Sequence, residues 1–206
     1  SLLIDVALLG LFAVQHSLMA RPGFKRRWTR LVPDAMERST FVLFASLALL
    51  LLFLEWRPLG GVVWDVAGSV AGTALTVTFT LGWLLVLVST FQIDHFELFG
   101  LKQVWLKLRG RSPAPPQFRV PTFYRQVRHP IYLGFLVAFW STPTMSLGHL
   151  IFAVATSGYI LIGIWFEERD LLAQFGQRYR DYRAQVGMLL PRWFGRTRKN
   201  QPATLA

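Results

Sequence analysis

Two groups of polar side chains flank one long apolar segment in the second half of the chain. Arg128 and His129 stand directly before this segment and Tyr132 lies just inside it, while Glu167 and Glu168 follow it. Two basic groups, a phenol and two adjacent carboxylates suit a ligand that carries charges of both signs. They can act together only if the chain brings the two ends of the segment to one place.

The same residues also have a structural explanation that needs no ligand. Proline is tolerated in the first turn of a helix, where the N–H that it lacks would be unpaired, so Pro130 can simply open a helix. Arg128 and His129 would then be interfacial residues, and the acidic pair would be a solvated helix end. Both interpretations are open until the surrounding elements are considered.

The composition is typical of a membrane protein. Of the 206 residues, 53% are hydrophobic and only 16% are charged, which is too apolar for an ordinary soluble domain. The absence of cysteine excludes disulfides, cysteine-ligated metals and a thioester on the protein, so any thiol must belong to a substrate. We expect no metal site. The net charge of +11 lies almost wholly in short segments between apolar runs, which favours membrane orientation signals over nucleic-acid binding.

Five apolar stretches predict an all-α integral membrane protein with five transmembrane helices. A spanning helix needs about 20 residues, with a lower limit near 17. The first stretch lacks a basic leader and a small-residue cleavage site, so we interpret it as a span and not as a signal peptide. Pro143 and Gly148 predict a tight turn between the last two stretches, which would form a C-terminal helical hairpin. The five stretches are 2–20, about 39–56, about 68–91, about 131–147 and about 150–166.

The basic residues predict the orientation. Lys and Arg number six in the first connection, one in the second, seven in the third, none in the fourth and eight in the tail. Since positive residues mark the cytoplasmic side, we expect the N-terminus outside and the C-terminus in the cytoplasm, in a bacterial inner membrane. The chain would be one membrane domain made of three spans, a cytoplasmic loop, the hairpin and a closing tail: 1–91, 92–130, 131–166 and 167–206.

A hairpin with arms of nearly equal length places its two outer ends at the same membrane depth. The basic pair and Tyr132 should therefore face the two glutamates at the cytoplasmic boundary. A short amphipathic helix with Tyr179 and Tyr182 follows and can fold back under the hairpin. This arrangement predicts a cytoplasmic pocket with a charged floor and apolar walls, which suits a ligand with a carboxylate, a cation and a ribose.

The segment FQIDHFELFGLKQVW, residues 91–105, interleaves aromatic residues with Asp94, His95 and Glu97. One interpretation is an interfacial amphipathic helix whose polar face happens to carry these groups. The other is that Asp94 and His95 end the third span at the mouth of a cavity, where one of them could serve as a base.

Two motifs resemble the isoprenylcysteine carboxyl methyltransferase superfamily of integral membrane methyltransferases. RHPIYLG and, after the hairpin, EERDLLAQFGQRYRDYRAQVGMLLP are similar to its shared pattern of RHPxYxG, EE, FGxxYxxY and a final LP. QHSLMARPGFK, residues 15–25, and the segment 91–105 look like one bacterial branch, the methanethiol S-methyltransferases. With these the resemblance covers most of the chain.

The resemblance implies S-adenosylmethionine (SAM) as methyl donor, bound on the cytoplasmic side. Arg128 and His129 would face its carboxylate or adenine, and one of the two glutamates would take a ribose hydroxyl or the amino group. Other residues would shape the wall or cover the site. The full set that the resemblance implies is Arg128, His129, Pro130, Tyr132, Leu133, Gly134, Glu167, Glu168, Tyr179 and Tyr182.

The implied reaction methylates a small thiol, methanethiol to dimethyl sulfide or hydrogen sulfide to methanethiol. A thiol with a pKa of about 8.5 is mostly protonated at neutral pH, so a base helps. His95, with Asp94 to orient it or act beside it, is the first candidate base. His16, near the cytoplasmic end of the first span, is the second; its alternative is a buried histidine bonded to Ser17 or to a backbone carbonyl.

Three other functions stay open. The acceptor could be an isoprenylcysteine or another lipid-like carboxylate, although the residues GIWF before Glu167 lack the arginine that carboxyl methyltransferases carry there. Sterol reductases share a related C-terminal pattern, but they have many more spans. A non-catalytic membrane subunit could instead bind haem through His16 and His95.

Overall fold

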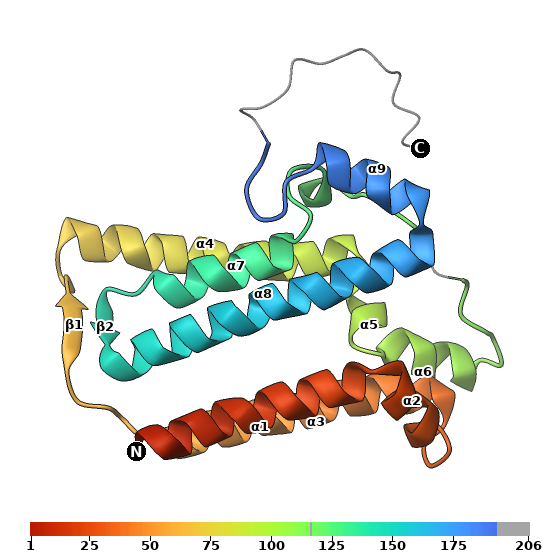
Figure 1. Ribbon diagram of the computed structural model, residues 1–206, viewed down its shortest axis with the longest axis horizontal. Coiled ribbons are helices and arrows are strands. Elements are labelled where there is room, and N and C mark those ends of the chain that lie inside the picture. The colour runs from red at the N-terminus through yellow and green to blue at the C-terminus, as the bar shows by residue number, and fades with distance from the viewer. Residues whose placement is uncertain (116, 193–206) are drawn as a thin grey trace.

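The computed structural model describes residues 1–115 and 117–192, and they form a helical bundle with one small sheet at one end (Figure 1). The tail beyond residue 192, which the sequence assigns to the closing segment, lies outside the described residues. The elements in chain order are α1 Leu2–Ala20, α2 Pro22–Trp28, α3 Asp34–Glu55, β1 Val62–Asp65, α4 Val70–Gln92, α5 His95–Leu98, α6 Leu101–Leu108, the short 3-10 helix η1 Phe123–Arg125, α7 Pro130–Trp140, β2 Thr144–Ser146, α8 Leu147–Phe175 and α9 Gln177–Gln185.

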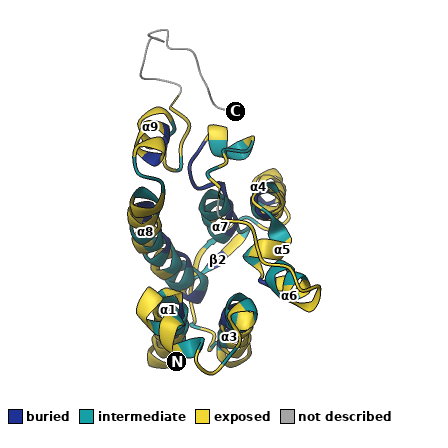
Figure 2. Ribbon diagram, turned by 90° about the vertical axis from the view of Figure 1, so that its right-hand side faces the viewer, coloured by how far each residue is buried: buried dark blue, intermediate teal, exposed yellow. Residues whose placement is uncertain are grey.

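Within the described residues, four helices, α1, α3, α4 and α8, are long and apolar enough to cross a membrane. Their apolar side chains are largely exposed on the outside of the bundle, as contact with lipid requires. Viewed along the bundle, α7 lies between α4 and α8, and α1 and α3 lie side by side below them (Figure 2). The prediction of an all-α membrane protein is confirmed.

The fourth predicted span is shorter than the sequence suggested. Its helix, α7, has 11 residues and is about 16 Å long, roughly half the thickness of the hydrocarbon core. Pro143 explains where the helix stops, because proline disfavours helical backbone at the residue before it and supplies no N–H. In place of the predicted tight turn, β2 follows Pro143 directly, and Gly148 lies in the first turn of α8.

The strand β2 pairs antiparallel with β1 from the connection after α3. Val62 lies opposite Ser146 and Asp65 opposite Thr144, and the Trp64 indole N–H donates to the Thr142 carbonyl at 3.0 Å. An extended residue advances about 3.3 Å against 1.5 Å in a helix. The three residues of β2 therefore advance the chain by about 10 Å toward the start of α8, and the start of α7 still meets α8 near Glu167.

Small residues let α4 and α7 pack closely. A Cβ on Gly82 of α4 would lie 2.8 Å from the Gly134 carbonyl oxygen, and a Cβ on Gly134 would lie 2.7 Å from the Gly82 carbonyl oxygen. Such close backbone approach replaces the hydrophobic driving force that is missing between helices in lipid. It fixes α7, and with it Arg128 and His129, relative to the long α4.

The segment 91–105 forms two short helices that bend back toward α3, and not the single interfacial helix of the first interpretation. Asp94 and Gly100 have positive φ angles of 82° and 79° and start α5 and α6. Gly100 packs against α3, where a Cβ would lie 2.4 Å from the Ser39 backbone nitrogen, and the Ser39 hydroxyl donates to the Gly100 carbonyl at 2.9 Å. The corner between α5 and α6 is thereby anchored on the first turns of α3.

Candidate active site

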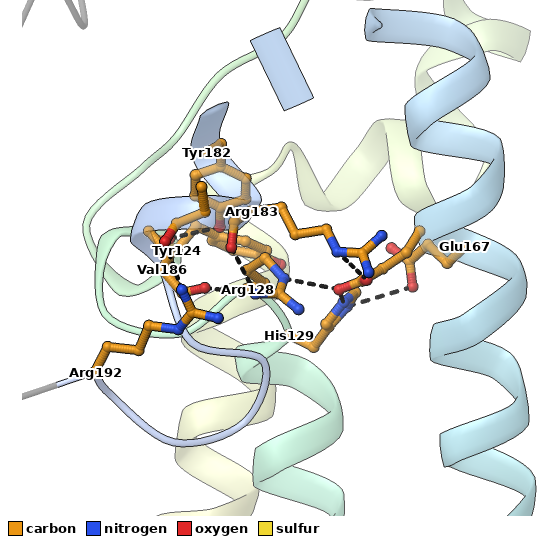
Figure 3. Close-up of polar contacts among 10 residues, drawn as sticks. Tyr124, Arg128, His129, Glu167, Tyr182, Arg183, Val186 and Arg192 are labelled. Atoms are coloured by element: carbon orange, nitrogen blue, oxygen red, sulfur yellow. Dashed lines mark hydrogen bonds and ion pairs between the residues drawn. The ribbon is translucent and has the colours of Figure 1, made fainter. Parts of the chain in front are cut away.

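The two ends of the hairpin meet in a buried ion-pair cluster (Figure 3). Arg128 donates from Nε to the Glu168 carboxylate at 2.7 Å, and His129 Nε2 lies 3.1 Å from the same oxygen. The side chains of Arg128 and Glu168 are only 7% and 10% exposed. The predicted proximity of these residues is confirmed. The first arm of the hairpin differs from the prediction, because it consists of the helix α7 followed by the strand β2.

Arg128 also ties the tail to the bundle. Its Nη1 donates to the carbonyls of Arg183 and Val186. The backbone N–H of Arg128 donates to Gly187 at 2.8 Å, and that of His129 donates to Met188 at 3.2 Å. Arg128 therefore joins the start of α7, the end of α8 and the chain that follows α9.

The adjacent glutamates have different surroundings. Glu168 is buried and has three basic partners, because Arg183 Nε lies 3.4 Å from its second oxygen in addition to Arg128 and His129. The Glu167 side chain is 44% exposed, and among the described residues it pairs with His129, whose Nδ1 is 3.7 Å from its carboxylate. Glu168 thus holds the surrounding elements together through its ion pairs, whereas Glu167 has oxygen atoms available to a ligand.

The two tyrosines of α9 face the bundle, as the sequence predicted. Tyr182 donates to the Tyr124 carbonyl at 2.6 Å, which pins α9 to η1. Tyr179 is 1% exposed, and its hydroxyl is buried without a hydrogen-bond partner among the described residues. Burial raises the pKa of both phenols above their ordinary range, so they are neutral hydrogen-bond donors.

A second group of aromatic and polar residues lies on α1, α3 and the middle of α8. The His16 ring lies 5.3 Å from the Phe12 ring and 4.8 Å from the Phe41 ring, and its Nδ1 is buried without a partner in the described chain. Ser17 is bonded to the Tyr159 hydroxyl at 3.0 Å and not to His16. The alternative in which Ser17 satisfies His16 is therefore wrong.

Tyr132 connects this second group to the ion-pair cluster. Its ring lies 5.7 Å from the His129 ring, and its hydroxyl lies against Gly163 of α8, one turn before Glu167. Tyr159 lies four residues before Gly163 on α8, so it is on the same face of that helix as the Tyr132 hydroxyl. The chain of neighbours runs from His16 through Tyr159 and Tyr132 to the cluster.

Asp94 is occupied in a surface ion pair. It accepts from the Glu97 backbone N–H at 3.0 Å as the cap of α5 and pairs with Lys102. The hydrogen bond from Lys102 holds the pKa of this carboxyl below its usual range. A cavity of about 540 Å³ lies beside this pair, lined by Asp94, Lys102, Arg119 and other residues of 92–121. Neither Arg128 nor Glu168 lines that cavity.

His95 is oriented by Thr90, which corrects the expectation that Asp94 orients it. Its Nδ1 lies 2.8 Å from the Thr90 hydroxyl. The ring stacks on Phe91 at 4.3 Å and also contacts Phe99 at 4.6 Å. These neighbours belong to α4 and to the turn after α5, and they do not include residues of the ion-pair cluster.

The remaining predicted residues lie around the start of α7. Pro130 is buried and occupies the first position of the helix, as expected. Leu133 is half-buried. Gly134 faces α4 and not the cluster, so packing is the role that its surroundings support.

Sequence reasoning missed four residues that the structure brings to these groups: Arg38, Tyr124, Tyr159 and Arg183. Arg38 was counted as a charge of the first connection, but it lies inside α3 and donates from Nε to the Leu98 carbonyl at 2.8 Å. An arginine at the start of an apolar helix was the available signal. Its partner is 60 residues away, so no local sequence pattern could identify that partner.

The chain is similar over most of its length to bacterial enzymes of known name. It is 58% identical to a methanethiol S-methyltransferase of Mycobacterium tuberculosis over 93% of this chain and 78% of that protein. It is 52% identical to methanethiol S-methyltransferase 2 of Bradyrhizobium diazoefficiens over 96% of this chain and 76% of that protein. Nurim of Rattus norvegicus is 32% identical over 83% of this chain and 68% of its own length. No family model and no solved structure matches.

Proposed function

The chain belongs to the family of the bacterial methanethiol S-methyltransferases, and we propose that it methylates methanethiol to dimethyl sulfide with SAM as the methyl donor. The observation that carries this proposal is the joining of the charged cluster at Glu167 and Glu168 to the aromatic group at His16. The first offers charges of both signs to a cofactor, and the second offers a base beside apolar walls to a small thiol.

The residues at the cluster fit SAM. Glu167 is a half-exposed carboxylate suited to the amino group or to ribose hydroxyls, and Arg183, with 48% of its side chain exposed, is suited to the carboxylate. The buried Tyr179 hydroxyl still has a hydrogen bond to give. Aromatic faces such as that of Tyr132 attract cations. When bound, SAM supplies a methyl group on a positively charged sulfur.

Among the three predicted bases, the geometry favours His16. Asp94 is ion-paired at the surface, and His95 has one ring nitrogen engaged by Thr90. His16 has a buried nitrogen without a partner among the described residues, and its neighbour Tyr159 lies on α8 one turn before Gly163, against which the Tyr132 hydroxyl lies. We therefore assign to His16 the removal of the thiol proton, and to Phe12 and Phe41 the exclusion of water around it.

The proposed orientation places the cluster at the cytoplasmic face, with the N-terminus outside. Basic residues gather on α2 and on α9, and the sheet of β1 and β2 lies at the opposite end of the bundle (Figure 1). SAM is made in the cytoplasm, so the cluster must face that side to receive it. All described elements then belong to one membrane domain embedded in lipid.

The test is gas chromatography of the headspace over purified protein in detergent. Dimethyl sulfide that forms only when SAM and methanethiol are both present would support the proposal, and a prenylcysteine assay on the same sample checks the alternative acceptor. Isothermal titration with SAM and S-adenosylhomocysteine reports the cofactor separately. Absence of dimethyl sulfide together with methylation of the prenylcysteine would overturn the assigned acceptor.

A further inference from the structure

Arg38 is a cation in the second turn of α3 that has no carboxylate partner within the described part of the chain. Its Nε donates to the Leu98 carbonyl at 2.8 Å, and among the described residues this is the one hydrogen bond that the guanidinium makes. The neighbouring Glu37 pairs with Lys25 at 3.5 Å instead. A half-buried guanidinium whose remaining N–H groups have no hydrogen-bond acceptor among residues 1–115 and 117–192 is suited to an anionic ligand.

The guanidinium and the proposed base both lie near the ring of Phe41. Arg38 Cζ is 5.1 Å from the centre of the Phe41 ring, and the His16 ring is 4.8 Å from the same ring. The His16 ring also neighbours Tyr159, which precedes Gly163 of α8 by one turn, and the Tyr132 hydroxyl lies against Gly163. If the thiol substrate gives its proton to His16 and the methyl donor occupies the cluster at Glu167, the guanidinium of Arg38 is near the sulfur of that thiol.

The elements around Arg38 hold it in one direction. The Leu98 carbonyl ends α5, and the next corner of the chain is anchored on α3 through Gly100 and Ser39. The Arg38 Nε is thus hydrogen-bonded to the end of α5, and the corner after α5 is itself bonded to α3, the helix that carries Arg38. This arrangement orients the two Nη groups without satisfying them.

We propose that Arg38 binds the sulfur of the acceptor as a thiolate, a role that rests on the proposed function. The thiol gives its proton to Nδ1 of His16, and the sulfur becomes an anion that the guanidinium stabilises. The sulfur then forms a bond to the methyl carbon as the bond between that carbon and the donor sulfur breaks, and the electron pair stays on the donor. The product sulfur is neutral, so Arg38 releases it, and His16 returns its proton to water.

The test compares Arg38→Met, which removes the charge and keeps the length, with Arg38→Lys, which keeps the charge. We expect Arg38→Met to raise the KM for methanethiol and lower kcat, with a loss in kcat/KM of at least about tenfold. The affinity for SAM, measured by isothermal titration, should not change. Arg38→Lys should recover part of the loss. Arg27→Met, on the exposed side of α2, is the matched control and should behave as the wild type.

The other outcomes would overturn the assignment. A loss of SAM affinity in Arg38→Met equal to the loss in kcat/KM would mean that Arg38 serves the cofactor's carboxylate. Full activity of Arg38→Met would mean that it binds neither. If Arg38→Met does not fold, Arg38→Gln removes the charge and keeps a donor for the Leu98 carbonyl, and the same comparison is made with it. A wild type that binds SAM but forms no dimethyl sulfide would overturn the proposed acceptor and this role together, whereas failure of Arg38 alone leaves the acceptor standing.

Discussion

At the scale of single residues, two adjacent glutamates illustrate how burial separates structure from ligand binding. Glu168 is enclosed by Arg128, His129 and Arg183. Glu167, at the preceding position on α8, is half exposed and lies 3.7 Å from His129 Nδ1. The letters EE in the sequence do not distinguish the two, because successive residues of a helix differ by about 100° in direction. Only the position of α7 decides which of them faces the ion-pair cluster.

Substitution of the two glutamates should therefore have different effects. Glu168→Gln breaks a buried pair and leaves Arg128 without its anion, which we expect to lower the free energy of unfolding by about 3 kcal/mol. Glu167→Gln should leave that free energy nearly unchanged and weaken SAM binding by roughly tenfold. Thermal unfolding in detergent and isothermal titration measure the two effects. Equal losses of stability for both variants would contradict the assignment.

The base can be identified from the pH dependence of turnover. His16→Ala should reduce the rate near neutral pH by about 10² or more, and the deficit should shrink as the pH rises. The reason is that the thiol ionises without help as the pH rises toward its own pKa. Headspace assays across a pH series measure this effect.

Asp94→Asn is the matched comparison for that series. Asn keeps the left-handed backbone at φ 82° and the cap of α5 and removes only the charge that Lys102 neutralises. Its pH profile should follow that of the wild type. A profile for His16→Ala that is parallel to the wild-type profile at all pH values would remove His16 as the base.

At the scale of elements, the contact between α4 and α7 positions the cluster. Gly134→Ala should lower stability by about 1–3 kcal/mol, because the added methyl would overlap the Gly82 carbonyl and the helices would have to separate. Gly158→Ala in α8 is the control, since no atom lies within 4 Å of its added Cβ, and it should be neutral or stabilising. Thermal unfolding of the two variants tests this. Equal stability would show that α7 is positioned by other contacts.

The elements that the sequence predicted well are those with a long apolar run and clear ends. Helices α1 and α4 begin and end close to the predicted stretches. The prediction of a full span at 131–147 was wrong, because an apolar run reports burial and not backbone conformation. Pro143 was interpreted as a turn, whereas its effect was to end α7 and leave an extended stretch for β1 to pair with.

At the scale of the whole molecule, the sequence predicted the charged cluster but not the group around His16. The cluster followed from the chain order of one hairpin, where length alone brings the ends together. The neighbours of His16 come from α3 and α8, and their approach depends on which face of each helix packs inward. Helices that face lipid on one side and protein on the other are apolar all round, so periodicity does not show that face.

The chain after α9 is held against the site by hydrogen bonds to Arg128. Arg128→Lys keeps a positive charge beside Glu168 but cannot also reach the carbonyls of Arg183 and Val186 as a planar fork does. We expect the amide protons of Arg128 and His129, which donate to Gly187 and Met188, to exchange with solvent roughly tenfold faster. Hydrogen exchange followed by mass spectrometry measures this rate.

The control for that experiment is Arg180→Lys, an exposed position on α9 whose Nε donates only to Gln177 among the described residues. It should leave exchange at residues 128 and 129 unchanged.

Addition of S-adenosylhomocysteine should slow exchange there in the wild type, because a ligand on Glu167 and Tyr179 would stabilise the closed tail. Slowing in the wild type but not in Arg128→Lys would mean that this arginine couples the tail to the ligand. Unchanged exchange in Arg128→Lys would mean instead that backbone pairing alone holds the tail in place.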